Sequence, residues 1–387
     1  MALIIFWTSF SIIFFTYIGY AIIIRIFLIF KKEKHVEEED FELPTLTFIV
    51  ACYNEIEYIE DKIKNTLSLK YDEDKINYFF VTDGTTDNSA EVISKYSQIE
   101  HFHKNLRQGK SAAINRIIPF VKSEIVVLSD ANTILNEEAL LMIAKCFQDP
   151  KVGAVAGEKK IIERNKDNAA GAGEGLYWKY ESKLKEWDSR LCTVVGAAGE
   201  LFAIKTSLYE NPPEDIIIED FYLSMRVVER GYKVAYQPKA CAQETASESI
   251  AEELKRKERI SAGGIQAIFR LRKIYNIFKY GMATFQFIVH RAFRWSLAPI
   301  CLVLLFVSNF FIASTNTFYF VVWVLQIVFY LLSFIGLLLS RKEIKAKLFF
   351  IPFYFSFMNF SVFIGLVKLI SGKQSAVWAK SKRSKNN

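Results

Sequence analysis

The chain has 387 residues and a formal net charge of +7, and 51% of its residues are apolar and 15% aromatic. This length suffices for one sizeable folded core and a membrane region, and the apolar excess at the two ends argues against an ordinary soluble protein. The five cysteines include no closely spaced pair, which argues against a disulfide framework or a zinc site and fits the reducing cytosol.

The first expected element is a membrane anchor over residues 1–30, whose only charged residue is Arg25. About 20 helical residues cross the hydrocarbon core of a bilayer, so this stretch is long enough to span it. No basic segment precedes it and no small-residue cleavage site follows, which is typical of an uncleaved anchor rather than a signal peptide. Lys31 and Lys32 open a charged linker, residues 31–43, and predict that the chain continues in the cytosol.

Strand and helix patterns alternate between residues 44 and 249. In chain order, we expect a strand at 45–51, a helix at about 59–67, a strand at 76–82, helices beginning near 89 and 109, a strand at 125–130 and a helix carrying Leu140, Ile143 and Phe147. Asp87 and Asn136 are expected to cap the helices that follow them. This order predicts an α/β fold with a mostly parallel, Rossmann-like sheet and helices on both faces.

Polar side chains follow three of the predicted strands where each strand ends. Asn54 and Glu55 follow the first, Asp83 the second, and Asp130 and Asn132 the third. Ligands of such sheets bind at the carboxyl ends of the strands, where acidic side chains accept hydrogen bonds from ribose or a nucleobase. Two oxygen ligands at i and i+2 also suit a divalent cation bridging a diphosphate. Each segment taken singly also fits a solvated turn or a helix cap, but the three ends together favour a nucleotide site.

Gly109 and Lys110 open a predicted helix. Its backbone N–H groups and the charge of Lys110 suit a phosphate. An ordinary surface lysine is the alternative for Lys110.

Residues 250–295 are predicted to form amphipathic helices at the membrane surface, with apolar residues such as Leu254 and Ile268 on the inward face. His290 and Trp295, just before the next apolar run, suit a collar at the membrane–water interface. The charge excess flanks apolar segments, so membrane lipids are expected partners and nucleic acid is not.

The C-terminal region, residues 296–372, contains three apolar runs of near-spanning length, at 296–313, 318–339 and 348–370. A basic tail, residues 373–387, follows them. If all three runs span, this tail lies outside the cytosol, against the positive-inside rule. Pro352 and Asn359 interrupt the last run, so a re-entrant or interfacial path for it stays open.

Seven short motifs together resemble glycosyltransferase family 2. They are IVACYNE (49–55), DGTTDNS (83–89), GKSAAIN (109–115), SDAN (129–132), GAAGELFAIK (196–205), IED (218–220) and KRKERISAGG (255–264). With the flanking apolar segments, the chain looks like the membrane-bound branch, which includes cellulose, chitin, hyaluronan and poly-N-acetylglucosamine synthases. The resemblance implies a GT-A fold over residues 44–249, an inverting transfer from a nucleotide sugar, and Mg²⁺ or Mn²⁺ as cofactor.

Carried over to this sequence, the resemblance implies that Asp83 contacts the uridine, that Asp130 and Asn132 hold the metal, and that Asp220 is the general base. The family usually has Asp at the position of Asn132; an amide oxygen still ligates a hard cation but removes one negative charge. From the residues alone, Asp220 also fits a helix cap or first-turn acid. The local rivals for its role are Glu219, which is also expected to bind substrate, Asp215 and Glu214.

Other expected substrate-binding residues are Gly199 and Glu200, in the loop that would choose the sugar, and Arg256 and Arg259. Polymerising members usually carry Q-x-x-R-W, where this chain has Arg256, Arg259 and Ile260. Arg259 can still bind a diphosphate through charge and paired hydrogen bonds. The missing Trp removes a flat surface for stacking sugars, which bears on processive chain growth.

We therefore expect a multi-pass protein of the cell membrane with a cytosolic catalytic domain. It would transfer sugar from a UDP-sugar, UDP-glucose or UDP-N-acetylglucosamine, to a growing polysaccharide or other glycan, with coupled export as an extension. The alternatives are single-sugar transfer to a lipid-linked acceptor and a non-catalytic nucleotide-binding membrane scaffold.

Overall fold

The computed structural model describes residues 1–31, 41–162, 169–341 and 347–377. Most of the charged linker, at 32–40, most of the basic loop at 342–346, and the tail from Trp378 onward lie outside the described residues.

A mixed eight-stranded sheet forms the centre of the domain, in the order β3-β2-β1-β4-β7-β6-β8-β5. The strands are β1 Leu46–Cys52, β2 Ile76–Asp83, β3 Glu100–Lys104, β4 Ile125–Asp130, β5 Ile134–Leu135, β6 Val152–Ile162, β7 Leu201–Lys205 and β8 Lys233–Thr245. The run from β3 to β4 is parallel, as is the pair β6–β8, whereas β7 is antiparallel to both of its neighbours and β5 to β8. The predicted α/β fold with a mostly parallel sheet is confirmed, although only β1, β2 and β4 had counterparts among the predicted strands.

Helices cover both faces of the sheet because successive strand residues point to opposite sides. On one face, residues such as Phe48 and Val127 pack against α3 Ile59–Leu67 and α6 Ala139–Cys146, beside the short α4 Ser89–Ile93. On the other, residues such as Ile49 and Val126 pack against α5 Lys110–Ile117, α8 Glu219–Glu229 and α9 Ile250–Arg270.

The strand register brings the polar strand ends to one edge. Ala51 of β1 pairs with Asp130 of β4, and Cys52 pairs with Thr82, the residue before Asp83. Leu201 of the antiparallel β7 pairs with Ser129, so the loop ending at Glu200 meets the same edge from the opposite chain direction. The site therefore contains residues that follow parallel strands and residues that precede the antiparallel strand β7.

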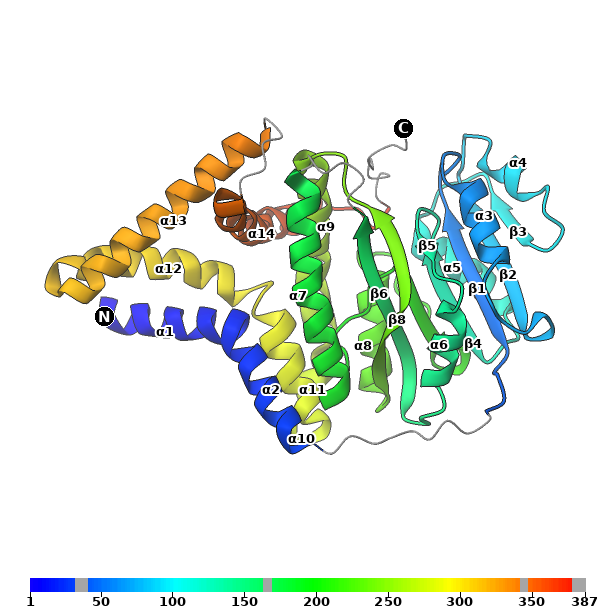
Figure 1. Cartoon of the computed structure of the whole chain (residues 1–387), viewed down its shortest axis with the longest axis horizontal. Helices are drawn as coiled ribbons and strands as arrows, with labels where there is room; N and C mark the ends of the chain where they lie inside the picture. Colours follow the sequence, from blue (N-terminus) through cyan, green and yellow to red (C-terminus); the bar gives the residue numbers. More distant parts are fainter. Residues whose placement is uncertain (32–40, 163–168, 342–346, 378–387) are drawn as a thin grey trace.

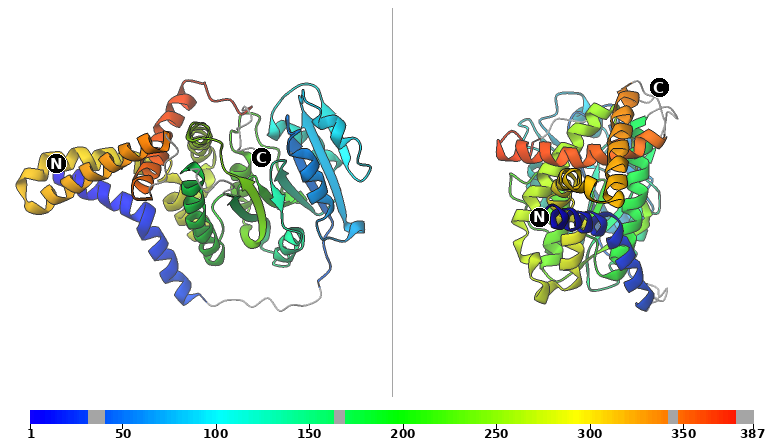
Figure 2. Two further views of the ribbon diagram at one scale, coloured as in Figure 1. Left: turned by 45° about the horizontal axis from the view of Figure 1, so that its top comes forward. Right: turned by 90° about the vertical axis from the view of Figure 1, so that its left-hand side faces the viewer.

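Four helices are long and apolar enough to cross a membrane, at Ala2–Phe30, Leu297–Thr315, Thr317–Ser340 and Leu348–Ile370, among the residues described. The first consists of α1 Ala2–Phe14, a π-helical turn η1 Phe15–Gly19 and α2 Tyr20–Phe30. The others are α12 Leu297–Ile312, α13 Thr317–Arg341 and α14 Lys347–Ile370. Helices α1, α12 and α13 project away from the sheet, while α2 lies along α7 Ala169–Leu191 (Figures 1 and 2).

Helix α14 follows a different path, along α9. Ser361 lies 3.3 Å from Ser261 between hydroxyl oxygens, Tyr354 donates to Glu253 at 3.2 Å, and Lys368 pairs with Glu258. At the end of this path, a Cβ placed on Gly109 would lie only 3.1 Å from Val377. The start of the basic tail thus lies on the same side as the sheet domain, which fits the re-entrant or interfacial alternative for the last apolar run.

Two local expectations were wrong. Asn136 does not cap the following helix, because its side-chain amide donates to Lys239 O and accepts from Cys241 N on β8, beyond the two residues that pair with β5. His290 does not face a membrane surface: it is fully buried against Asp188, with a 2.8 Å contact from Nδ1 to a carboxylate oxygen. The strands and α7 supply polar partners that the local sequence does not reveal.

Candidate functional site

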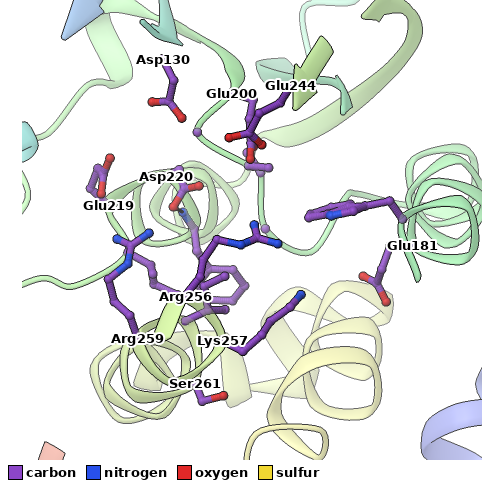
Figure 3. A pocket seen from close by; sticks show the side chains of 18 of the residues that line it. Asp130, Glu181, Glu200, Glu219, Asp220, Glu244, Arg256, Lys257, Arg259 and Ser261 are labelled. Carbon is purple, nitrogen blue, oxygen red and sulfur yellow. Dashed lines mark hydrogen bonds between the residues drawn. The ribbon is translucent and has the colours of Figure 1, made fainter. Parts of the chain in front are cut away.

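A cavity of about 680 Å³ lies at the carboxyl ends of β1, β2 and β4 and continues past α9 to α14. Figure 3 shows the labelled acidic side chains Asp130, Glu200, Asp220 and Glu244 around this space, with Arg256, Lys257 and Arg259 extending into it from α9. Of the residues expected to bind substrate or metal, all line this cavity except Asn54.

Lys110 lies at the centre of the acidic residues. Its Nζ is 2.5 Å from Asp130 Oδ1 and 3.2 Å from a carboxylate oxygen of Glu219, and its side chain is only 17% exposed. The surface-lysine alternative is therefore wrong. Gly199 permits this approach, because a Cβ there would lie 3.0 Å from Lys110 Nζ and 3.3 Å from Asp220 Oδ2.

Asp220 occupies the second position of α8. Its Oδ1 accepts a hydrogen bond from the N–H of Phe221 at 2.8 Å, while Ile218 is the N-cap residue. Asp220 is thus a first-turn acid, not the cap, and it lines the cavity. Burial and the nearby charge of Glu219 raise the pKa of Asp220 to about 7, although Lys110 acts to lower it. A carboxylate with a pKa near neutrality suits general-base catalysis.

Asp130 ends β4 and faces the same space. Burial raises the pKa of Asp130, and the negative charge of Glu200 adds to this, while the ammonium of Lys110 opposes it. Conversely, burial alone would lower the pKa of Lys110, but Asp130 and Glu219 hold it above its usual range. The two side chains form an ion pair.

Asp83, the last residue of β2, holds the backbone of the loop before α5 in place. Its Oδ2 accepts hydrogen bonds from the N–H groups of Gln108 and Gly109, both at 2.7 Å, and its Oδ1 pairs with Arg116 at 3.3 Å. A carboxylate has about four acceptor positions, so Asp83 can accept a further hydrogen bond. Beside it, the guanidinium of Arg107 lies 3.6 Å from the ring centroid of Tyr53.

The two polar residues that follow β1 have different roles: Asn54 is structural, and Glu55 lines the cavity. Asn54, with a positive φ of 54°, holds the loop after β2: its amide oxygen accepts from the N–H of Thr86 at 2.8 Å. Glu55 lines the cavity, and its N–H donates to Ser89 at 3.0 Å.

Asn132 belongs to a buried network of charges. Its amide donates to Glu244 at 3.1 Å, and Lys159 Nζ lies 2.5 Å from Glu244 while also pairing with Glu200. Burial alone would raise the pKa of Glu200, but the ammonium of Lys159 holds it well below its usual range. The expected substrate-binding residue Glu200 is therefore anchored, and Lys159 and Glu244 were missed because β6 and β8 carry no motif.

The residues fit a divalent cation held mainly by a nucleotide. Among the described residues, no group of three acidic, histidine or cysteine side chains is arranged to hold a metal. Asp130 and Asn132 offer one carboxylate and one amide oxygen at a single strand end. Mg²⁺ and Mn²⁺ accept such a sparse set when substrate phosphates and water supply the remaining ligands.

Helix α9 supplies the basic wall expected from the sequence. Arg256 pairs with Glu253 at 2.9 Å, and Arg259 donates to Ile217 O at 3.5 Å and extends toward Glu219 and Asp220 (Figure 3). Burial lowers the pKa of Arg259, while Glu219 and Asp220 oppose this.

An indole also lines the cavity near Ile260, but from another segment. Trp295 packs against Gly264 of α9, where a Cβ would come within 2.3 Å of its ring, and its centroid lies 5.0 Å from that of Phe221. Trp295 was expected to anchor the chain in the membrane interface. Its place in the cavity wall depends on the turn before α12, which no local pattern predicts.

Lys62 is a further residue that sequence reasoning missed. It is fully buried under the Asp130 loop, where Nζ donates to Ser129 at 2.8 Å and to Thr133 O at 2.9 Å. Ser129 in turn donates to Glu200 O at 3.0 Å. Burial lowers the pKa of Lys62 to about 7. A signal existed, because Lys62 shares the inward face of its helix with Ile59, Ile63 and Thr66.

Comparison with known proteins places this site in context. The model of a family described as glycosyltransferase-like family 2 matches residues 44–263. The poly-beta-1,6-N-acetyl-D-glucosamine synthase of Staphylococcus aureus strain COL is 32% identical over 240 residues, covering 59% of this chain and 57% of that protein. The Staphylococcus epidermidis synthase is 29% identical over 265 residues, covering 65% and 63%. The chain thus matches less than two thirds of these relatives' length.

A solved structure resembles nearly the whole chain. The mannosyltransferase PcManGT from Pyrobaculum calidifontis, in complex with GDP-Man and Mn²⁺, superposes with a TM-score of 0.72 at 20% identity, covering 96% of this chain and 100% of that one. At this identity the likeness shows the fold, including the arrangement of the sheet domain with the flanking helices.

Proposed function

The chain belongs to the glycosyltransferase-like family 2, and from this premise we propose that it is an inverting membrane glycosyltransferase that uses a UDP-sugar. The observation that carries the proposal is the convergence of Asp130, Lys110 and Asp220 at one edge of the sheet, with Arg259 opposite. A buried carboxylate beside a cationic wall is the arrangement that sugar transfer to a hydroxyl requires.

In the proposed reaction, a hydroxyl oxygen of the acceptor attacks the anomeric carbon of the donor sugar. The bond from that carbon to the diphosphate breaks on the opposite side, and UDP leaves with the bonding electrons. Asp220 accepts the hydroxyl proton, for which a pKa of about 7 is well matched. Lys110 and Arg259 lie where they can stabilise the departing diphosphate.

A divalent cation, Mg²⁺ or Mn²⁺, would be held by Asp130 and Asn132 together with the diphosphate. When bound, it would neutralise negative charge on the leaving group. Because the protein offers one carboxylate and one amide oxygen there, we expect the nucleotide to supply most of the remaining ligands.

We propose UDP-N-acetylglucosamine as the donor, ahead of UDP-glucose. The support is the name of the relatives, poly-beta-1,6-N-acetyl-D-glucosamine synthases, at 32% identity over the matched 240 residues. In this proposal Asp83, with Tyr53 and Arg107 beside it, surrounds the uridine, and Gly199 and Glu200 face the sugar.

For the acceptor, a growing polysaccharide and a lipid-linked sugar are the two candidates. The names of the relatives favour a polysaccharide. Trp295 also lines the cavity, so an aromatic surface for a sugar is present although Ile260 replaces the Trp of the motif. The continuation of the cavity to α14 favours a lipid-linked acceptor. In either case the sheet domain would face the cytosol and the apolar helices would cross or line the cell membrane, with export of a polymer as an extension of the first candidate.

The test is release of UDP by the purified full-length protein in lipid, with a panel of UDP-sugars and GDP-mannose, followed by sizing of the radiolabelled product. Faster release with UDP-N-acetylglucosamine than with the others supports the proposal. Binding of UDP without any turnover, across donors and acceptors, would instead favour the non-catalytic scaffold. A long product supports the polysaccharide, and a product extended by one sugar supports the lipid-linked acceptor.

A further inference from the structure

The membrane-side half of the cavity carries chemistry that the donor does not use. Its far wall is apolar and aromatic and comes from η1 and α14; it comprises Tyr17, Ile18, Phe350, Ile351, Tyr354 and Phe355. Tyr17 joins the two elements by a 2.7 Å hydrogen bond to Asn359 and a ring contact of 5.0 Å with Phe355. This wall lies on two of the apolar helices that are candidates to cross the membrane.

The cavity opens at the surface of those helices. Ile18 and Ile351 both line the cavity, and each is 55% exposed. Ile18 lies in the candidate span Ala2–Phe30 and Ile351 in Leu348–Ile370, so their exposed faces meet hydrocarbon if these helices are in the bilayer. A lipid chain can therefore enter sideways between η1 and α14 without crossing water.

Between the apolar wall and Asp220 lies an excess of positive charge. The cationic lining residues here are Lys185, Arg256, Lys257, Arg291 and Arg294. Arg256 and Lys257 share Glu253, while Arg291 and Arg294 share Glu181. Among the described residues, Glu253 and Glu181 thus pair with four of these five cations.

Lys185 is the one cation of this set that has no ion pair among the described residues, although the charges of Glu181, Glu200 and Glu158 act on it. It is 3% exposed and makes no hydrogen bond or ion pair with the residues that the structure describes. Its Nζ lies 5.3 Å from the ring centroid of Trp178, and those of Lys159 and Lys257 lie 4.9 and 6.0 Å from the same ring. A buried ammonium lacking a hydrogen-bonded anion is costly, so an anionic ligand group that reached Lys185 would gain a strong hydrogen bond. Burial and the charge of Arg291 lower the pKa of Lys185, whereas Glu181, Glu200 and Glu158 act to raise it.

We propose that Lys185, with Lys257 beside it, binds the phosphate of a lipid-linked acceptor whose hydrocarbon chain lies along α14 and leaves between η1 and α14. This inference rests on the proposed function, since the acceptor's sugar hydroxyl must reach Asp220. The cavity is continuous from Asp220 to this wall, so sugar, phosphate and lipid chain occupy it in that order. A neutral polysaccharide would not satisfy the charge of Lys185.

The test measures binding of a long-chain polyprenyl phosphate to the full-length protein in detergent, by native mass spectrometry and by competition. The uncharged polyprenol of the same length, phosphatidic acid and inorganic phosphate serve as comparison ligands. We expect the polyprenyl phosphate to bind at least about tenfold more tightly than the polyprenol, as the loss of a charge-assisted contact implies. Equal binding of the phosphate and the alcohol would overturn the proposal, and so would equal binding of phosphatidic acid, which would make this a headgroup site.

Variants assign the effect to Lys185. Lys185→Met is expected to weaken polyprenyl phosphate about tenfold or more, and Lys185→Arg to retain binding, since it keeps the charge. The matched control is Lys183→Met on the same helix, because Lys183 is exposed and paired with Glu186. Undiminished binding by Lys185→Met would overturn the proposal, and Lys185→Arg keeps the test valid if the Met variant does not fold.

Titration of the same samples with UDP separates this inference from the proposed function. If the wild-type protein binds UDP but not the lipid phosphate, the acceptor site is wrong and the proposed transferase stands. If it binds the lipid phosphate but neither UDP nor UDP-sugars, the proposed function fails while the lipid site is retained.

Discussion

The ammonium of Lys110 lies 2.5 Å from Asp130 Oδ1, on the carboxylate that the sequence assigns to a metal. If Asp130 binds the proposed cation, lysine and cation would compete for one oxygen. A nucleotide diphosphate would resolve the competition, because it attracts both positive charges and brings its own oxygen ligands. This pairing suggests an order of events in which the cation arrives with the nucleotide.

Replacing Lys110 tests that order. In Lys110→Met, Asp130 loses its partner, so Mn²⁺ should bind the nucleotide-free protein several-fold more tightly, while affinity for UDP falls about tenfold through the lost charge. Electron paramagnetic resonance of free Mn²⁺ and UDP titration measure the two effects. Weaker Mn²⁺ binding in the variant would show that Lys110 does not compete for Asp130.

Removing the cation gives a second test. We expect exhaustive chelation of divalent cations to abolish sugar transfer and to weaken UDP binding, and added Mn²⁺ or Mg²⁺ to restore both. Turnover that persists at full rate after chelation would exclude a metal role for Asp130 and Asn132.

Asp220→Asn addresses the general base. The amide keeps the size of the side chain but cannot accept the acceptor's proton, so kcat should fall by about 10² to 10⁴. UDP affinity should stay close to wild type, because Asp220 is not proposed to contact the nucleotide. Asp215→Asn is the control, since Asp215 is exposed and pairs with Arg270 at the surface. A wild-type rate in Asp220→Asn would make the base assignment wrong.

The pH dependence follows from the pKa of about 7 for Asp220. A base must be deprotonated, so kcat/KM should rise with pH and level off above neutrality. The charge of Glu219 contributes to the raised pKa, so Glu219→Gln should move the rising limb to lower pH. Lys110 acts in the opposite sense, and Lys110→Met should move the limb to higher pH. Shifts in the same direction for both variants would contradict this account.

Lys62 is expected to hold the segment around Asp130 in place through its hydrogen bonds to Ser129 and Thr133. Lys62→Met removes the hydrogen bonds to Ser129 and Thr133, which leaves buried oxygens unsatisfied and should cost about 1–3 kcal/mol of stability. The displaced loop should also raise the Mn²⁺ concentration needed for half-maximal UDP binding. Lys64→Met is the matched control, because Lys64 is exposed on the same helix and pairs with Glu60. Unchanged Mn²⁺ dependence in Lys62→Met would reduce its role to stability alone.

The sequence by itself determined the sheet domain and the residues at its edge. Apolar runs such as 125–128 are recognisable as strands, and parallel strands place their carboxyl ends at the same edge of a sheet. The location of Asp83 and Asp130 at one edge was therefore predictable without information on long-range contacts. The order of the motifs added Asp220 and Arg259. The strand predictions depended on local periodicity and chain direction, which a sequence records directly, and the roles of Asp220 and Arg259 depended on the resemblance.

Only the tertiary structure decided which groups surround those residues. Lys62 of α3 and Lys159 of β6 bind Ser129 and Glu200, respectively, from outside the cavity. Lys185 of α7 and Trp295, in the turn before α12, line the cavity itself. The same is true of the buried state of His290 and of the path of α14 along α9. Each depends on contacts between segments far apart in the chain. The spacing of charged residues along the chain can be seen in the sequence. The environment of each charged side chain is set by those long-range contacts and has no local sequence pattern.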